Sequence, residues 1–306
     1  MDHWKALNLW SPHYLMESMG KDHRVTVALT PDGLADSVQD IAANEVDGSA
    51  VRGFCLPHEE AMTLGDFFKL FWTSKEVVDG VVPYLQRQNS SMTAELEPLL
   101  EDIDRRIPWF EQALGLESAN LEAINFWLGD HRSTTSFHKD HYENLYGVVK
   151  GEKIFHLLPP TDAYRLALRA YPTAKWTLKE GVAMRSPVLR AELLDDGKSR
   201  ILWSPVHPSP IDERSPSAAI PMEELHNDYP HFFDPTLPPP LVARVRKGDM
   251  LFLPSMWYHY VEQREVEASG CVMAVNYWYD MSFDRSYALW SFCSQLAEKA
   301  GLMDTL

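Results

Sequence analysis

Three consecutive residues, His138, Lys139 and Asp140, form the pattern in this sequence with the most evident chemistry. In a strand, side chains two positions apart point to the same side, so His138 and Asp140 would face together. One imidazole and one carboxylate are two thirds of a 2-His-1-carboxylate triad, which leaves coordination positions open and suits non-haem Fe(II). An isolated His-x-Asp is more often a surface hydrogen-bonded pair, so a third ligand from a distant strand has to complete the site.

The residues around this pair favour the metal interpretation. Thr135 precedes the histidine by three positions, and Asn144 and Tyr146 follow Asp140 at even spacing, which predicts that they share its face. Lys153 stands in otherwise apolar surroundings. The lysine either extends its ammonium to solvent at the end of a hairpin or binds a dianionic cosubstrate through its compact charge.

The elements that must position these residues divide the chain of 306 residues into three parts. We expect a helix-rich part (about 1–122), a part of short strands with turn signals (about 123–283) and a final helix (about 284–303). In the first part, Thr63–Lys75 and Ala94–Leu114 are predicted to be helical. The pattern predicts a single domain over the whole chain, mainly β with helical cladding, built as an antiparallel barrel or sandwich.

Two stretches of the strand-rich part carry further predictions. Residues 135–158 are predicted to form a hairpin that turns at Gly151. Residues 201–240 contain 10 of the 21 prolines, which predicts an excursion with little regular structure. A loop this long is usually a functional rim or a mobile segment, so a lid over a substrate is one possibility.

Composition limits the classes of partner and compartment. The formal charge is −16, from 28 basic and 44 acidic side chains. An acidic surface argues against nucleic-acid binding and fits a Lys/Arg-rich peptide, although solubility alone explains it equally well. Cys55, Cys271 and Cys293 are far apart and odd in number, so we expect no disulfide framework. Without a signal peptide or a long apolar run, we expect no membrane association and a cytoplasmic, or also nuclear, location.

The segment TSFHKDHYENLYGVVKGEKIFHLLPP, from Thr135 to Pro160, resembles the JmjC and related cupin-type 2-oxoglutarate oxygenases. It is similar to the asparaginyl hydroxylase that inhibits hypoxia-inducible factor, in the spacing T-x-x-H-x-D-x-x-x-N-x-[FY]…K. The runs NFWLG, HKDHYENLY, GEK and NYWYDM are more similar still to the JmjC (3S)-lysyl hydroxylases of developmentally regulated GTP-binding proteins. The resemblance covers about residues 10–300 and implies a double-stranded β-helix, the cupin or jelly-roll barrel.

The resemblance also implies a set of site residues. His259 ends a Pro-x-x-Trp-x-His pattern, which makes it the match to the third iron ligand beside His138 and Asp140. Matches to the residues that hold the distal carboxylate of 2-oxoglutarate are Lys153, Thr135 and Tyr84. Matches to residues lining the cosubstrate are Asn144, Tyr146 and Asn276. Trp278 either walls the substrate pocket or packs in the core.

The implied reaction uses Fe(II), 2-oxoglutarate and O2, gives succinate and CO2, and leaves a 3S-hydroxyl on a substrate lysine. The implied partner is a GTP-binding protein that presents this lysine; Asp280 and Glu143 are candidates for meeting its charge. Three alternatives stay open: a JmjC methyl-lysine demethylase, a peptidase-type activity, and a cupin-fold binding protein without catalysis. Relatives usually have further N-terminal helices that help them dimerise, so a homodimer is possible but undetermined.

Overall fold

The structure is a computed structural model. It describes residues 1–42, 50–77, 80–88, 90–116, 120–178, 188–208, 222–266 and 270–304. None of the helices in these ranges is long and apolar enough to cross a membrane.

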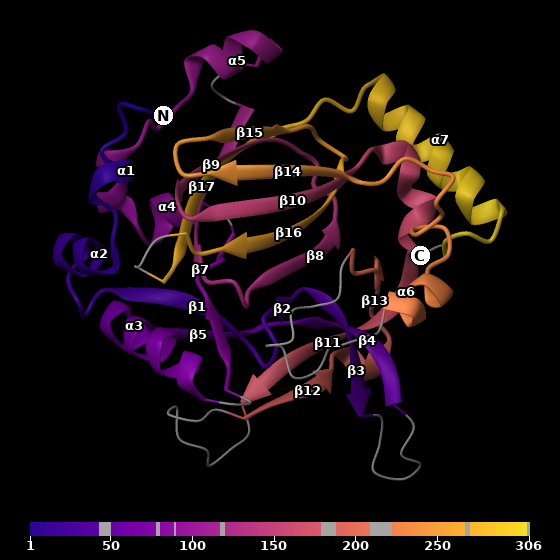
Figure 1. Ribbon diagram of the computed structural model, residues 1–306, viewed down its shortest axis with the longest axis horizontal. Helices are drawn as coiled ribbons and strands as arrows, with labels where there is room; N and C mark the ends of the chain where they lie inside the picture. The colour runs from indigo at the N-terminus through magenta and orange to yellow at the C-terminus, as the bar shows by residue number, and fades with distance from the viewer. Residues whose placement is uncertain are drawn as a thin grey trace.

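Two opposed sheets form a double-stranded β-helix at the centre of the molecule (Figure 1). The first has the order β15-β9-β17-β7, with strands Met250–Leu253, Tyr142–Lys150, Val272–Asp280 and Leu121–Gly129. The second has the order β14-β10-β16-β8-β2, with strands Leu241–Arg246, Glu152–Leu158, Tyr258–Arg264, Thr134–His138 and Leu34–Ala35. The apolar residues between the sheets include Tyr146, Val148, Phe155, Leu157, Val245, Leu253, Val261 and Ala274. The predicted fold class, mainly β with helical cladding, is confirmed.

The predicted hairpin at Gly151 is wrong. β9 and β10 are consecutive, but β9 pairs with β15 and β17, whereas β10 pairs with β14 and β16. Gly151, with φ of +76°, carries the chain from one sheet to the other. A Cβ there would lie 2.9 Å from the carbonyl oxygen of Arg264, so a larger residue would be strained as well as crowded. The two strands therefore line opposite walls of one interior.

The segment predicted as one continuous strand through the His-x-Asp pair is also interrupted. β8 ends at His138 and β9 begins at Tyr142. Asp140 lies in the connection, where the amide of Met256 donates to its carbonyl oxygen at 2.9 Å. Asp140 therefore does not share a strand with Asn144, and alternation along one strand is not what brings it to His138.

The N-terminal third contains more strands than predicted. Besides β2, it holds β1 (Arg24–Thr30), β5 (His58–Thr63) and β6 (Val82–Tyr84) in a three-stranded sheet, and β3 (Ser37–Ala42) and β4 (Ala50–Leu56) in another. The sheet that contains β3 and β4 also includes β11 (Arg169–Leu178) and β12 (Leu189–Leu193), in the order β12-β11-β4-β3, and β13 (Arg200–Trp203) pairs with β11. The described helices of the N-terminal third are α1 (Ala6–Leu9), α2 (Pro12–Met19), α3 (Leu64–Thr73), η1 (Ser74–Glu76), α4 (Ser91–Ala94), η2 (Glu97–Asp102) and α5 (Pro108–Leu114).

Proline explains one difference within this part. The helix predicted over Ala94–Leu114 is three short helices, because Pro98 and Pro108 each stand in a first helical turn. A proline lacks the amide hydrogen that a continuing helix needs and disfavours helical geometry in the residue before it. The prediction for Thr63–Lys75 is confirmed by α3, which Thr63 caps by accepting from the amide of Asp66. Its phenylalanines pack into the large core that covers the outer face of the four-stranded sheet.

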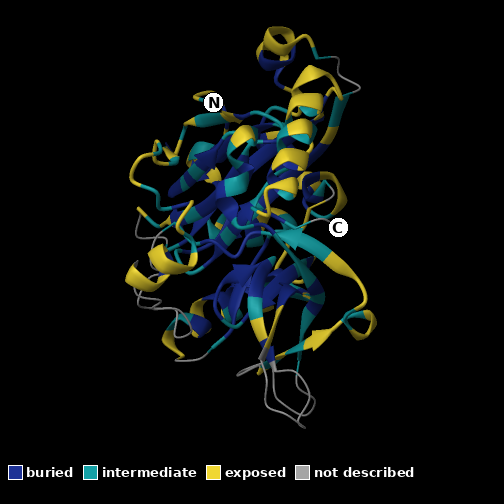
Figure 2. Ribbon diagram, turned by 90° about the vertical axis from the view of Figure 1, so that its right-hand side faces the viewer, coloured by how far each residue is buried: buried dark blue, intermediate teal, exposed yellow. Residues whose placement is uncertain are grey.

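Helices also cover the outer face of the five-stranded sheet. These are η4 (Pro160–Leu166), α6 (Met222–Asp228) and the predicted C-terminal helix, α7 (Arg285–Lys299), with η5 (Asp195–Gly197) near β12. Figure 1 shows α6 and α7 on the opposite side of the barrel from α1–α3, and Figure 2 shows the buried strands lying behind exposed helices and loops. The proline-rich excursion includes β13 and α6, so it has more regular structure than predicted. Much of the predicted lid, residues 209–221, lies outside the described residues.

Candidate active site

Three side chains that can bind a metal meet where β8 ends and β16 begins. His138 is the last residue of β8, Asp140 follows it, and His259 is the second residue of β16. One ligand atom from each lies within 4.8 Å of the other two. The Nε2 atoms of His138 and His259 lie 3.8 Å and 3.6 Å from Oδ2 of Asp140. Two imidazoles and one carboxylate at this spacing fit Fe(II) as a facial triad.

Hydrogen bonds to the backbone orient both imidazole rings. Nδ1 of His138 donates to the carbonyl oxygen of Ser136 at 2.9 Å, and Nδ1 of His259 donates to that of Trp257 at 3.1 Å. Because a carbonyl only accepts, each ring carries its proton on Nδ1 and leaves Nε2 free for a metal. Burial, with His138 nearby, lowers the pKa of His259 to about 4. At neutral pH this ring is therefore in the form that binds metals.

A register shift brings Thr135 to the interior together with His138. His259 lies opposite His138, but Val261 lies opposite Thr135, so three steps along β8 match two along β16. Strict alternation would place residues three apart, such as Thr135 and His138, on opposite faces of the strand. One extra residue in a bulge of β8 instead returns both side chains to the same face. Thr135 consequently shares the face of Val261, which belongs to the barrel interior.

Lys153 provides a buried positive charge inside the barrel. Its side chain is 2% exposed, and Nζ donates to the hydroxyl of Tyr84 at 2.9 Å. Among the described residues no carboxylate forms an ion pair with it, and burial lowers its pKa to about 7. A buried ammonium without a counter-ion is unfavourable, so this pocket fits an anion. The distal carboxylate of 2-oxoglutarate is an anion of the right kind.

The four-stranded sheet places the other predicted cosubstrate residues on the opposite wall. Nδ2 of Asn276 donates to Oδ1 of Asn144 at 3.1 Å, and Oδ1 of Asn276 accepts from the indole of Trp127 at 2.7 Å. Tyr146 lies opposite Asn276 in the strand register and packs edge-on against Phe155, with ring centroids 5.1 Å apart. The three predicted residues, Asn144, Tyr146 and Asn276, are thus adjacent and buried.

Trp278 shares the inner face of β17 with Asn276, two residues away. Its ring stacks on Tyr142 with centroids 4.8 Å apart and planes 7° from parallel. It is 7% exposed, yet its indole N–H has no hydrogen-bond partner among the described residues. A buried donor without an acceptor is unusual, because such groups are nearly always paired. The tryptophan therefore offers a free donor as well as an aromatic surface.

Three acidic residues around the site differ in the hydrogen bonds that they already form. Glu143 accepts from the amide and hydroxyl of Ser255 at 3.2 Å and 2.8 Å. Asp280 ends β17 and is exposed. Asp36, which sequence reasoning missed, follows β2, and Ser136 donates to its carbonyl oxygen at 2.6 Å. Burial raises the pKa of the Asp36 carboxyl to about 6, although His138 acts in the opposite direction.

Sequence reasoning also missed Gln263. It lies four residues after His259 on β16, which places both side chains on one face, and it lies opposite Lys153 in the register. Its side chain is 4% exposed and neither amide atom has a partner among the described residues. The spacing from His259 was the signal in the sequence that could have identified it.

A second group of potential ligands is an ion-pair network. Asp130, His131 and Glu265 also bring ligand atoms within 4.8 Å of one another. Arg132 contacts Asp130 at 2.8 Å, and Lys75 lies 3.2 Å from Asp130 and 3.4 Å from Glu265. These cations already compensate the carboxylates, so the group has no need of a metal.

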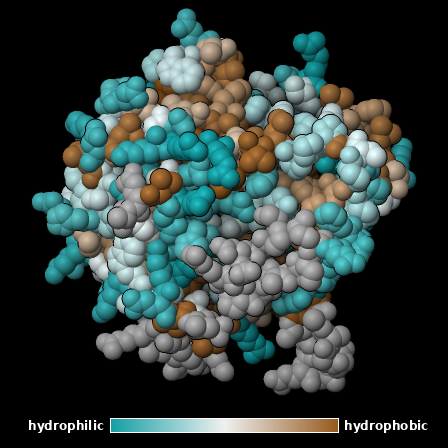
Figure 3. Space-filling model, in the orientation of Figure 1, coloured by the Kyte–Doolittle hydropathy of each residue, from teal (hydrophilic) through white to brown (hydrophobic). Residues whose placement is uncertain are grey.

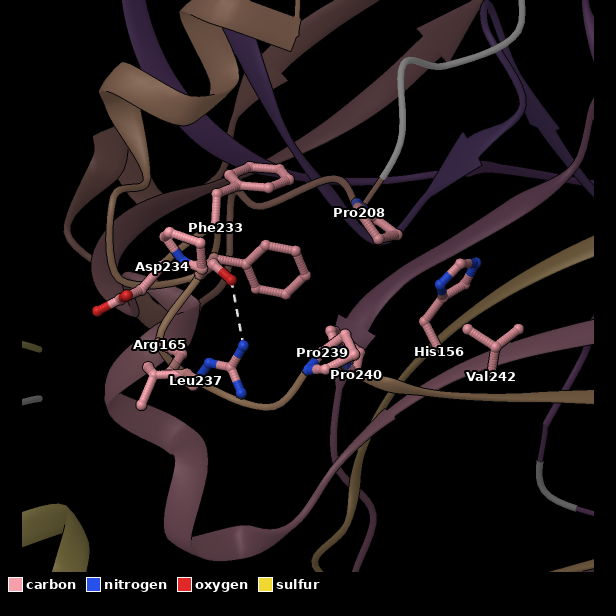
Figure 4. Close-up of a pocket in the computed structure, with 11 residues that line it drawn as sticks. His156, Arg165, Pro208, Phe233, Asp234, Leu237, Pro239, Pro240 and Val242 are labelled. Atoms are coloured by element: carbon pink, nitrogen blue, oxygen red, sulfur yellow. Dashed lines mark hydrogen bonds between the residues drawn. The ribbon is translucent and has the colours of Figure 1, made fainter.

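A cavity of about 420 Å³ lies on the outer side of the five-stranded sheet (Figure 4). His156, Arg165 and Val242 line it together with Pro208 and with aromatic and proline side chains of residues 232–240. His156 is adjacent in sequence to Leu157, which lies opposite His259, so alternation places the cavity behind the wall that carries the metal ligand. None of the triad residues lines this cavity.

The chain is similar in sequence to a known domain family and to several known proteins. The model of the cupin-like domain family matches residues 1–285. The chain is 38% identical over 303 residues to the lysine-specific demethylase JMJ32 of Arabidopsis thaliana, covering 99% of this chain and 79% of the relative. It is 36% identical over 301 residues to JmjC domain-containing protein E of Dictyostelium discoideum, covering 96% and 80%. It is 35% identical over 304 residues to the bifunctional peptidase and (3S)-lysyl hydroxylase JMJD7 of Homo sapiens, covering 99% and 82%.

Proposed function

This chain belongs to the cupin-like JmjC family of 2-oxoglutarate-dependent oxygenases, and we propose that it is a (3S)-lysyl hydroxylase acting on a GTP-binding protein. The observation that carries the proposal is the triad of His138, Asp140 and His259, whose ligand atoms converge within 4.8 Å. The similarity to a named (3S)-lysyl hydroxylase over 99% of this chain supports the choice of reaction.

In this proposal the two histidines and Asp140 hold Fe(II), and Lys153, Tyr84 and Thr135 hold the distal carboxylate of 2-oxoglutarate. Bound iron supplies the oxidative decarboxylation that gives succinate and CO2 and delivers one oxygen atom to the substrate. The protein contributes position: backbone carbonyls orient the imidazoles, and the buried ammonium orients the cosubstrate. The apolar residues between the sheets surround the buried end of the site, where Lys153 lies.

Asp36 is the acidic group that we propose to meet the ammonium of the substrate lysine. Its backbone carbonyl accepts a hydrogen bond from the hydroxyl of Ser136, two residues before His138, and no hydrogen bond to its carboxylate is found among the described residues. Its φ of +52° is an uncommon conformation for a residue other than glycine, and such strain clusters at functional sites. Glu143 is engaged by Ser255 and is less available.

The test measures two products, succinate and the oxidised peptide, in one reaction. The protein is incubated with Fe(II), 2-oxoglutarate and a lysine-containing peptide from a developmentally regulated GTP-binding protein. Succinate together with the gain of one oxygen on the lysine is the expected result. Succinate without oxidation of the peptide would overturn the substrate while keeping the oxygenase. Iron bound without succinate would overturn the reaction itself and favour a cupin-fold binding protein.

Asp36→Asn tests the recognition of the lysine. Asparagine tolerates positive φ and keeps the shape of the side chain, so the backbone should be undisturbed. Loss of a charge-assisted hydrogen bond predicts a KM for the peptide about 10- to 100-fold higher, with unchanged binding of 2-oxoglutarate. Asp22→Asn is the matched control at an exposed carboxylate outside the site. An equal effect of both variants would exclude a specific role of Asp36.

A demethylase is the second candidate, because the relative of higher identity is named a lysine-specific demethylase. The same triad could oxidise an N-methyl group instead of a β-carbon. A trimethyl-lysine peptide offered in the same assay decides between them: release of formaldehyde would favour demethylation, and a stable gain of oxygen on unmodified lysine would favour hydroxylation.

A further inference from the structure

Gln263 carries a buried side-chain amide that is unpaired in the part of the chain that the structure describes. Its Nε2 and Oε1 atoms have no partner among the described residues, although the residue is only 4% exposed. Leaving buried polar groups unpaired is costly, and each such group in a folded protein needs an explanation such as an absent ligand.

The strand register puts this amide beside the buried ammonium. Gln263 on β16 lies opposite Lys153 on β10, and directly opposed residues in antiparallel strands have Cβ atoms about 4.5–5.5 Å apart on one face. The same face of β16 carries His259, four residues earlier. The amide therefore lies deeper in the barrel than the triad, at the level of the residue that binds the far end of the cosubstrate.

Gly129 keeps space for this arrangement. A Cβ built on Gly129 would lie 2.5 Å from Nε2 of Gln263 and 2.6 Å from Cδ2 of Tyr84. Both side chains reach their positions only because β7 has no side chain at its last residue. The glycine, the glutamine and the tyrosine thus form one wall of the pocket around the ammonium of Lys153.

We propose that Gln263 is a positioning residue for the cosubstrate, whose side-chain amide donates a hydrogen bond from Nε2 to the distal carboxylate of 2-oxoglutarate. Lys153 supplies the charge and the glutamine fixes the direction of the carboxylate, which a lysine alone does poorly because its ammonium is a point charge. This inference rests on the proposed assignment of Lys153 to the same carboxylate. The glutamine amide is neutral, so it adds a donor without repelling the ammonium.

Two substitutions of Gln263 separate this role from simple packing. Gln263→Leu removes both polar groups at similar volume and is expected to weaken 2-oxoglutarate binding about 10- to 100-fold, the usual effect of losing a hydrogen bond to a charged group. Gln263→Glu places a carboxylate next to Lys153. The internal ion pair is expected to raise the melting temperature of the cosubstrate-free protein and to suppress binding more strongly than the leucine variant does.

The experiment is calorimetric titration of 2-oxoglutarate into the full chain loaded with Mn(II), which measures binding without turnover. Melting curves and Mn(II) affinity are recorded for each variant, and Arg264→Leu, on the other face of β16, is the matched control. Cosubstrate affinity lowered by both variants with Mn(II) affinity unchanged would support the inference. Affinity equal to that of the unaltered protein in Gln263→Leu would overturn it. Absence of binding by the unaltered protein would overturn the proposed function as well, so the two failures are distinguishable.

Discussion

His138 and His259 lie directly opposite each other on β8 and β16, and the centroids of their rings are 4.0 Å apart. They are 121 positions apart in the sequence, so the antiparallel pairing of the two strands is what makes them neighbours. Asp140 joins them from the connection that follows β8. The triad is therefore attached to rigid elements by two of its three members.

Substitution of a triad histidine should remove the metal and leave the fold. His138→Ala is expected to abolish Fe(II)-dependent formation of succinate, because one ligand of three is lost. Its stability in metal-free buffer should change by no more than about 1 kcal/mol, since the ring is only half-buried. Mn(II) titration and thermal melting measure the two effects. Unfolding of the metal-free variant would show that the histidine is structural; His141→Ala, at an exposed ring nearby, is the control.

Binding of 2-oxoglutarate should weaken as the pH rises above about 7. Burial lowers the pKa of Lys153 from 10.5 to about 7, and only the protonated lysine attracts the carboxylate. The dissociation constant is therefore expected to rise up to about tenfold per pH unit above that value, and binding at pH 8 should take up a proton. Titration in two buffers of different ionisation enthalpy measures this uptake in the Mn(II)-loaded protein. Lys153→Met should abolish it.

The same group predicts the pH dependence of stability without cosubstrate. Between pH 7 and 10.5 the unfolded chain binds more protons at Lys153 than the folded protein does. The contribution of Lys153 to the free energy of unfolding should therefore increase with pH across this window and be least favourable below it. Chemical denaturation of the unaltered protein and of Lys153→Met across the window checks the sign. A difference between them that does not change with pH would contradict the assignment.

Trp278→Phe should affect the protein substrate more than the cosubstrate. Phenylalanine keeps a ring against Tyr142 but removes the unpartnered indole N–H. If that donor meets the substrate backbone, the KM for the peptide should rise about threefold to tenfold, while the dissociation constant of 2-oxoglutarate stays the same. Trp109→Phe, at a residue 60% exposed, is the matched control. Unchanged kinetics in both variants would identify Trp278 as a core residue.

Asp130 should matter for stability and not for metal content. Burial alone would raise the pKa of Asp130, but Arg132 and then Lys75 more than offset it, so the pKa is lowered. Its contribution to stability is therefore lost as the pH falls through that lowered value. Asp130→Ala removes a fully buried carboxylate from the partly buried Arg132 and Lys75 and should cost about 3 kcal/mol. Metal analysis should find one ion per chain in both the variant and the unaltered protein; a second ion present only in the unaltered protein would reveal a metal site at Asp130.

The negative net charge of the chain would attract a basic partner. The chain has 16 more acidic than basic side chains, and the face in Figure 3 mixes hydrophilic side chains with smaller apolar groups. Asp36 is inside the site, whereas the excess charge is spread over the surface. Charge complementarity of this kind accelerates encounter more than it fixes the binding geometry.

The sequence by itself determined the elements whose periodicity or turn chemistry is local. The helices α3 and α7 followed from apolar spacing, and the strand-rich character of the middle of the chain followed from its turn signals. The proline pattern was sufficient, in retrospect, to divide Ala94–Leu114 into short helices. The motif spacing also singled out His138, Asp140, His259 and Lys153 as candidates, because these positions lie in short segments whose residue types and order are distinctive.

Only the tertiary structure decided which of these segments became partners. Gly151 was a correctly identified turn, but the choice between a hairpin and a crossing to the other sheet depends on which strands arrive later in the chain, β16 and β17. Asp36 carries no local signal of function, and it became a candidate because the hydroxyl of Ser136, two residues before His138, contacts its carbonyl oxygen. The spacing of Gln263 from His259 gains meaning only once the register places this residue opposite Lys153, where its amide is buried without a partner among the described residues. Burial and unsatisfied hydrogen bonds are properties of the assembled barrel, since they depend on contacts between residues far apart in the sequence.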